Sequence, residues 1–340
     1  MKKHFQQIDV VKGLAIIAVL LLHSFPRATL LDTYAVYHIW QAVPVFMVVM
    51  GLNLGLSLTG KEQRLTSLYT RTYFSKKASR ILVPFLQVFV FSLLIGFLWE
   101  RFGKREVLAF DWNLLVGVLP VSGRGNYFIT LLLQSILFLP IIGYSFQKKP
   151  VLTTGVLIAL EASFLLWSKQ LAYFDRDNYL YDAAFPRYFS AVAYGLWLAK
   201  AIRANKRLAP ALPLVLLAAL GAVLLYLILY TGLNLDPIRP EWQLQQGLTF
   251  GYAAWLVWLA FQLLPASSDS MPLQLLANLG RASYHVFLVQ VVYFGLAKDY
   301  PNALLSLAIC LSAGYLYFRY EDAITAVLAK PIGWLKASKA

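Results

Sequence analysis

Long, nearly uncharged apolar blocks recur along the chain, and charged residues, proline or glycine bound each of them. A helix needs about 20 apolar residues to cross a hydrocarbon core of roughly 30 Å, and most blocks have about this length. Of the 340 residues, 59% are hydrophobic and 14% are charged, whereas soluble domains carry about 25% charged residues. The sequence therefore excludes a water-soluble globular protein and predicts an all-α, polytopic membrane helix bundle.

The blocks predict about ten transmembrane helices within one membrane domain that covers residues 1–340. Their expected bounds are 8–25, 34–58, 81–99, 127–146, 151–167, 185–202, 210–231, 244–264, 273–297 and 303–322. Segment 107–120 contains Asp111, Trp112 and Asn113. We expect this segment to be interfacial or re-entrant because polar residues interrupt its apolar pattern.

The distribution of charge predicts the orientation. With the N-terminus inside, the inner segments hold 17 basic and 3 acidic residues, a net charge of +14, and the outer segments hold ten of each. Cytoplasmic loops are enriched in Lys and Arg, so both termini are expected in the cytoplasm of a multi-pass cell-membrane protein. The basic balance is thus a topology signal, and no nucleic-acid partner is expected. Segment 24–27 is a poor signal-peptide cleavage site, so the first helix is expected to remain in the protein.

The first block contains two ionisable residues, Lys12 and His23. Ionisable side chains inside a membrane are costly and usually serve a function. A separation of eleven residues, at about 100° and 1.5 Å per residue, places both on one helix face roughly 16 Å apart. One interpretation is that this face is a functional surface. The other is that the lysine reaches the inner membrane interface and the histidine is hydrated at the outer one.

A basic cluster, residues 71–80, precedes the third predicted span. Its members Lys77 and Arg80 lie three residues apart and are expected to share a helix face. One interpretation is a stop signal that contacts anionic lipid. The other is a phosphate-binding patch for a cytosolic ligand.

Further polar residues lie within or beside the predicted spans. Glu161 is expected to face the bundle interior and to pair there, because an acid in mid-span is expensive. Loop 169–182 combines aromatic and acidic residues, which indicates either sugar stacking or an aromatic belt at the headgroups. His38 is expected to be hydrated and His285 to pack. The single cysteine, Cys310, and the spacing of the histidines predict no metal site.

The motifs together resemble the integral membrane acyltransferase 3 family. Segment 8–23 resembles its first-helix signature, in which a basic residue, ten residues and a histidine follow one another. Segments 43–51, 76–84, 126–132 and 279–290 resemble, in order, its second helix, its basic stretch, its aromatic fourth-helix start and its "LGxxSYxxYLxH" stretch. Three departures are Lys12 in place of a frequent arginine, Gln290 in place of a frequent histidine, and Glu321 without the proline of the closing "E-x-P" element.

The resemblance implies a stand-alone membrane O-acyltransferase that moves an acyl group, commonly acetyl, from cytosolic acyl-CoA to cell-envelope carbohydrate or lipid-linked sugar. It implies catalytic roles for His23 and Glu321, with His23 a general base or a transiently acylated group. The implied substrate-binding residues are Lys12, Lys77, Arg80, Asn126, Tyr127, Glu161 and Arg187. Acetyl-CoA is then a co-substrate, and no permanently bound cofactor is expected. A transporter or flippase of a lipid-linked saccharide is the alternative, and the oligomeric state stays open.

Overall fold

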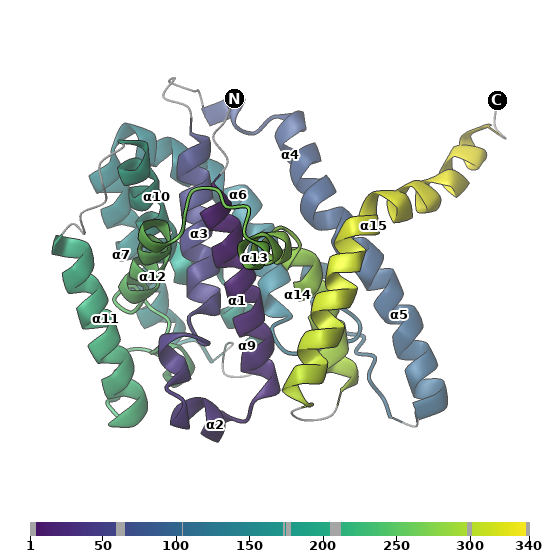
Figure 1. Cartoon of the computed structure of the whole chain (residues 1–340), viewed down its shortest axis with the longest axis horizontal. Helices are drawn as coiled ribbons and strands as arrows, with labels where there is room; N and C mark the ends of the chain where they lie inside the picture. The colour runs from purple at the N-terminus through teal and green to yellow at the C-terminus, as the bar shows by residue number, and fades with distance from the viewer. Residues whose placement is uncertain are drawn as a thin grey trace.

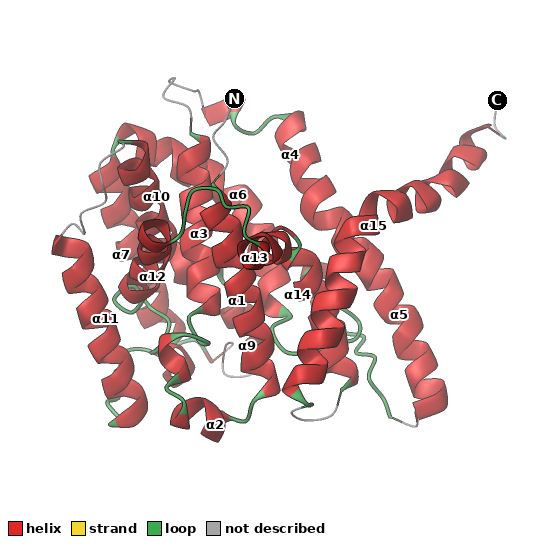
Figure 2. Cartoon of the chain, in the orientation of Figure 1, coloured by secondary structure: helices red, strands yellow, loops and turns green. Residues whose placement is uncertain are grey.

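The described part of the chain is built of helices. The computed structural model describes residues 5–58, 65–103, 105–172, 174, 178–204, 212–297 and 301–337. Within these ranges it contains no strand, and an isolated bridge joins Leu108 to Val121. Figure 2 shows this helical make-up in red. The predicted all-α polytopic bundle is confirmed.

Seven helical segments in the described ranges are long and apolar enough to cross a membrane. Four of them are single helices: Gln6–Ser24 (α1), Tyr127–Lys148 (α6), Pro150–Ser168 (α7) and Leu212–Tyr230 (α11). A fifth, Ala303–Val327, is part of α15 (Ala303–Ala337). The other two are composite: Ala35–Ser57 contains η1 (Ala35–Tyr37) and α3 (Ala42–Ser57), and Arg71–Gly103 contains α4 (Arg71–Lys77), η3 (Ala78–Leu82) and α5 (Val83–Gly103). The shorter helices α10 (Phe189–Arg203), α12 (Phe250–Leu263) and α14 (Ser283–Leu296) occupy the other predicted blocks. The total of about ten spans stays a prediction.

The block 273–297, predicted as one span, is two helices. α13 (Met271–Arg281) ends at Ala282, and α14 starts at the next residue. Figure 1 shows α13 almost end-on, across the direction of α14. α13 carries Gln274, Asn278 and Arg281 among its apolar residues, the composition of an amphipathic helix that lies along an interface. The single-span prediction was wrong because no Gly–Pro signal marks the break.

Segment 107–120 forms no spanning helix, in agreement with the prediction. It holds the 3₁₀ turn η4 (Trp112–Val116), and the Asp111 carboxylate accepts the N–H of Asn113 at 2.8 Å. Gly117 then turns the chain with a φ of +113°, a conformation that favours glycine. After this turn the chain continues to the N-terminal end of α6.

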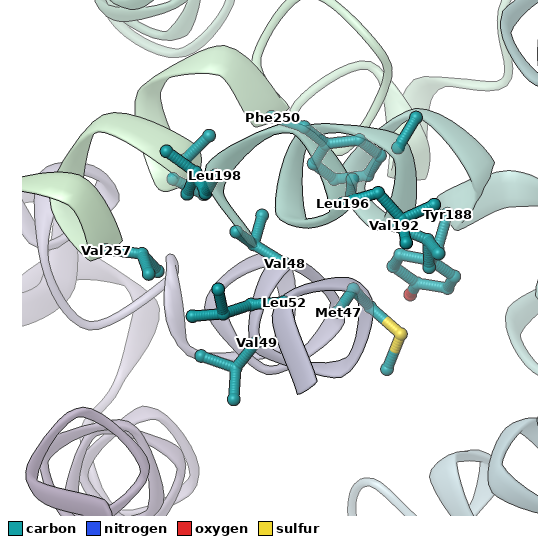
Figure 3. Close-up of a cluster of buried hydrophobic side chains, with 14 of the residues drawn as sticks. Met47, Val48, Val49, Leu52, Tyr188, Val192, Leu196, Leu198, Phe250 and Val257 are labelled. Atoms are coloured by element: carbon teal, nitrogen blue, oxygen red, sulfur yellow. The ribbon is translucent and has the colours of Figure 1, made fainter. Parts of the chain in front are cut away.

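Close backbone contacts hold the central helices together. A Cβ on Gly51 of α3 would collide with the carbonyl of Val192 in α10, and one on Gly195 would collide with that of Val48. Small residues at such crossings let helix backbones approach closely in a membrane. Figure 3 shows side chains of α3, among them Val48, and of α10, among them Val192, in a buried cluster that also includes Phe250 of α12.

α1 crosses α13 in the same close manner. A Cβ on Gly13 would collide with the carbonyl of Leu276, and one on Gly280 would collide with that of Asp9. The crossing therefore fixes the part of α1 that carries Lys12. The start of α1, the start of α4 and the C-terminal end of α15 lie at one end of the bundle, and α2 (Arg27–Asp32) lies at the other (Figure 1). Which end is cytoplasmic stays a prediction.

Candidate active site

A cavity of about 270 Å³ follows one face of α1. Lys12 and His23 both line it, so the face predicted from their spacing exists in the fold. α1 runs from Gln6 to Ser24. Lys12 therefore lies in the N-terminal half of this helix, and His23 lies in its last turn. Other polar lining residues are Arg80, Tyr127, Gln245, Ser283 and Tyr284, and the wall between the two ends is largely apolar.

Lys12 is paired within its own helix. Its ammonium lies 2.7 Å from the Asp9 carboxylate, one turn earlier, and the Asp9 side chain is 7% exposed. Acid–base pairs three residues apart meet on one helix face, so the spacing of Asp9 and Lys12 could have revealed the pair. Lys12 therefore presents a partly neutralised charge to the cavity.

Arg80 and Lys77 have different surroundings. Residues Ala78–Leu82 form a π-helical turn, which changes the rotation between the two positions. Arg80 lines the cavity and is exposed. The Lys77 ammonium lies 5.8 Å from the centroid of the Tyr73 ring, and Lys77 does not line the cavity. Of these two residues, Arg80 alone therefore lines the cavity.

The His23 imidazole lies under a loop that joins segment 107–120 to α6. Arg124 Nη1 donates to the His23 carbonyl at 3.0 Å, and the His23 ring meets the Phe294 ring edge-on at 5.6 Å. Gly125 has a φ of +85°, and a Cβ built on it would lie 3.2 Å from His23 Nε2. Neither Arg124 nor Gly125 was identified from the sequence, although the Gly123–Arg124–Gly125 pattern marks a turn.

Asn126 holds this loop rather than lining the cavity. Its Nδ2 donates to Ser122 Oγ at 2.9 Å, and its Oδ1 accepts the Leu119 N–H at 3.3 Å. A Cβ on Gly123 would collide with the carbonyl of Val291, so the loop packs directly on α14. Asn126 thus positions the first residue of α6, Tyr127, which lines the cavity.

Arg187 lies behind the cavity wall. It is 0% exposed, and its guanidinium carbon lies 3.2 Å from the centroid of the Trp242 ring. Its Nη1 donates to the carbonyls of Tyr181 and Asp182, each at 3.4 Å. Trp242 also meets the Tyr127 ring edge-on at 6.4 Å. Arg187 therefore reaches the cavity lining through Trp242 and Tyr127, an arrangement that the sequence did not reveal.

Glu161 of α7 is 2% exposed and faces the bundle interior, as expected for an acid in mid-span. Its Oε2 accepts the Ser190 backbone N–H at 2.7 Å and the Ser190 hydroxyl at 2.5 Å. Ser190 lies in the first turn of α10, where free N–H groups favour negative charge. Glu161 thus joins α7 to α10 and does not line the cavity.

Glu321 is not beside His23. Its Oε2 lies 2.8 Å from His285 Nε2, in a contact that joins α15 to α14. Neither residue lines the cavity. His285 therefore has a specific polar partner in addition to its packing, and the catalytic role of Glu321 stays a prediction.

In the described part of loop 169–182, Tyr181 contributes to the core. Tyr181 of α9 (Asn178–Asp182) is 0% exposed and stacks on Phe164 with the ring centroids 5.7 Å apart. Burial raises the pKa of Tyr181, so its phenol stays protonated. Residues 173 and 175–177 lie outside the described ranges. His38 is exposed and does not line the cavity around His23.

The helices and this cavity define a multi-pass membrane protein with an internal site on its first helix. The family model described as an acyltransferase domain matches residues 5–330. The chain therefore belongs to the acyltransferase 3 family and is a membrane acyltransferase, as the resemblance of its motifs indicated. Neither the search of curated proteins nor the search of solved structures returned a match.

Proposed function

We propose that the protein transfers an acetyl or other acyl group from cytosolic acyl-CoA to a hydroxyl of a cell-envelope saccharide or lipid-linked sugar, in the cell membrane. One observation carries the proposal: a single cavity has Lys12 and Arg80 toward one end and His23 toward the other. The sidedness predicted by charge opens the cationic end to the cytosol.

The cationic end suits the nucleotide part of CoA. Arg80 makes no hydrogen bond or ion pair with another described residue, so its guanidinium is free to bind phosphate. Lys12 adds a second positive group, moderated by Asp9. Between these cations and His23, apolar side chains such as Ile16 and Val19 suit an uncharged pantetheine arm.

His23 lines the cavity, which supports a role for its imidazole in proton transfer at the thioester. A neutral imidazole can accept a proton from an alcohol near neutral pH. In the proposed reaction the acceptor oxygen bonds to the thioester carbonyl carbon, and His23 takes the hydroxyl proton. The C–S bond then breaks, and the CoA sulfur receives that proton. Transient acylation of His23 is the alternative route, and it predicts CoA release before any acceptor is added.

The test uses purified protein in lipid with labelled acetyl-CoA, with CoA release as the readout. His23→Ala should lower turnover by a factor of about 10² or more, since general base catalysis contributes about 10²–10⁴. His38→Ala is the matched control, because His38 is exposed and lies outside the cavity. Wild-type protein that moves a lipid-linked saccharide without releasing CoA would favour the transporter alternative.

A further inference from the structure

The His23 end of the cavity is lined by polar and aromatic residues that the proposed reaction has not yet used. They are Trp40, Tyr127 and Gln245. Trp40 lies two residues before the start of α3. The segment between α2 and α3 lies at the end of the bundle where α1 finishes (Figure 1). Trp40 therefore lines the part of the cavity that contains His23.

The turn η6 brings Gln245 to the same end. The Gln245 backbone N–H donates to the Trp242 carbonyl at 3.0 Å, and the Trp242 ring meets the Tyr127 ring edge-on at 6.4 Å. Tyr127 follows Gly125 by two residues, and a Cβ built on Gly125 would lie 3.2 Å from His23 Nε2. Segments far apart in the sequence thus place His23, Tyr127 and Gln245 around one end of the cavity.

Gln245 has an unused donor at the cavity. Its Oε1 accepts the Tyr188 hydroxyl at 3.3 Å, and its Nε2 donates no hydrogen bond within the described ranges. The side chain is half-buried and lines the cavity, so a ligand there can meet its amide. The indole N–H of Trp40 also makes no hydrogen bond in the described part of the chain. The His23 end thus combines a flat ring with N–H donors.

This end of the cavity is also uncharged. Apart from His23, the ionised residues that line the cavity are Lys12 and Arg80, toward the other end, and Arg124 does not line it. A carboxylate held here would lose water without gaining a partner in the cavity lining, which is costly. A neutral sugar ring avoids this cost, because its hydroxyls can accept from the free donors and its C–H face can pack on the Trp40 ring.

We propose that Trp40, Tyr127 and Gln245 form the acceptor subsite and that this subsite takes an uncharged sugar ring in preference to an acidic one. The inference rests on the proposed acyl transfer and names the class of its acceptor. Gln245 Nε2 donates to one sugar oxygen and thereby holds another hydroxyl near His23. The oxygen of that second hydroxyl bonds to the thioester carbonyl carbon, and its proton passes to His23. The C–S bond breaks, and the CoA sulfur leaves with its electrons and receives the proton.

The test of acceptor class uses two probes with the same alkyl chain, dodecyl β-D-glucoside and dodecyl β-D-glucuronide. Each is given with labelled acetyl-CoA to the purified protein in lipid. Wild type should transfer the label to the glucoside with a kcat/KM at least about tenfold above that for the glucuronide, because the glucuronide carries an unpaired carboxylate. Equal transfer to both probes, or a preference for the glucuronide, would overturn the neutral subsite. CoA release that neither probe accelerates would also overturn it.

Variants test the individual residues. Gln245→Leu should raise the KM for the glucoside by about 2–10-fold, the contribution of one hydrogen bond, and leave the KM for acetyl-CoA unchanged. Trp40→Ala should raise the glucoside KM more than Trp40→Phe, which keeps a flat ring. A Gln245→Leu protein with a raised KM for acetyl-CoA and an unchanged KM for the glucoside would assign Gln245 to the donor and overturn the acceptor subsite.

Tyr188→Phe is the matched control. It removes the hydroxyl that donates to Gln245 Oε1, while the ring can keep its stacking on Phe250, with the centroids 5.8 Å apart. Tyr188 does not line the cavity, so the glucoside KM should stay within about twofold of wild type. An equal rise in Tyr188→Phe and Gln245→Leu would mean that Gln245 only anchors its loop. The unfolding temperature in detergent checks the folding of each variant. Failure of the subsite leaves the proposed function standing if wild type releases CoA and His23→Ala does not, whereas no CoA release from wild type would refute the proposed function.

Discussion

Asp9 and Lys12 form an ion pair at 2.7 Å on the wall of the cavity that also contains His23. In the proposed donor site, a phosphate would share the Lys12 ammonium with Asp9. The pair also lies at the crossing of α1 with α13, where Gly280 packs against the Asp9 carbonyl. The proposal therefore predicts that the Asp9 carboxylate competes with the donor for Lys12.

Asp9→Asn should lower the KM for acetyl-CoA, because it frees the Lys12 ammonium to bind phosphate. Partly exposed ion pairs contribute about 0.2–1 kcal/mol, which corresponds to a change of up to about fivefold. Lys12→Met should raise the same KM, and Lys12→Arg should be tolerated better. The double variant Asp9→Asn/Lys12→Met should behave like Lys12→Met. An Asp9→Asn protein with a raised donor KM would show that Asp9 orients Lys12 instead of competing for it.

Arg80→Ala should raise the KM for acyl-CoA more than it lowers kcat, since a phosphate contact acts equally in the ground state and the transition state. Lys77→Ala should have a smaller effect, because the Lys77 ammonium lies over Tyr73 and outside the cavity. The comparison of the two single variants in steady-state assays tests whether Arg80 alone of the two contacts the donor. Equal effects would place both cations at the donor.

Gly125→Ala should lower kcat strongly. The new Cβ would lie 3.2 Å from His23 Nε2, and alanine would have to adopt a φ of +85°. The backbone strain alone costs about 1–2 kcal/mol. Gly232→Ala separates the two effects, because Gly232 has a φ of +76° with nothing within 4 Å of a built Cβ. Both variants should unfold at lower temperature in detergent, and only Gly125→Ala should lose turnover. Comparable turnover in the two proteins would mean that the space beside Gly125 has no part in catalysis.

The shared wall of Lys12 and His23 could be predicted because both lie in one uninterrupted helix, α1, whose geometry sets the angle between them. The same reasoning did not reveal that Arg80 lines the cavity and Lys77 does not, since a π-helical turn has no simple signature in the sequence. It also failed at Ala282, where one apolar block is divided between an interfacial helix and a spanning one.

Contacts between distant segments were the least predictable part of the site. Glu321 meets His285 because α15 packs along α14, and nothing in either segment alone indicates the register of that packing. Gln290 reaches the loop at Arg124 across 166 residues of sequence. Arg187 was identified as a substrate-binding residue, yet its burial on Trp242 depends on η6 (Pro240–Trp242), more than 50 residues later.

The orientation of the bundle can be tested with single cysteines placed in a Cys310→Ser background. This substitution removes the native thiol, which is 0% exposed. Thr66 and Thr33 are both exposed and lie on predicted opposite sides of the membrane. The inner charge of +14 predicts that a membrane-impermeant maleimide labels Thr33→Cys in intact cells and labels Thr66→Cys only after the cells are opened. The reverse pattern would put Arg80 and Lys12 on the side without acyl-CoA. The cavity would then face the wrong compartment for its donor, and the proposed direction of transfer would fail with the topology.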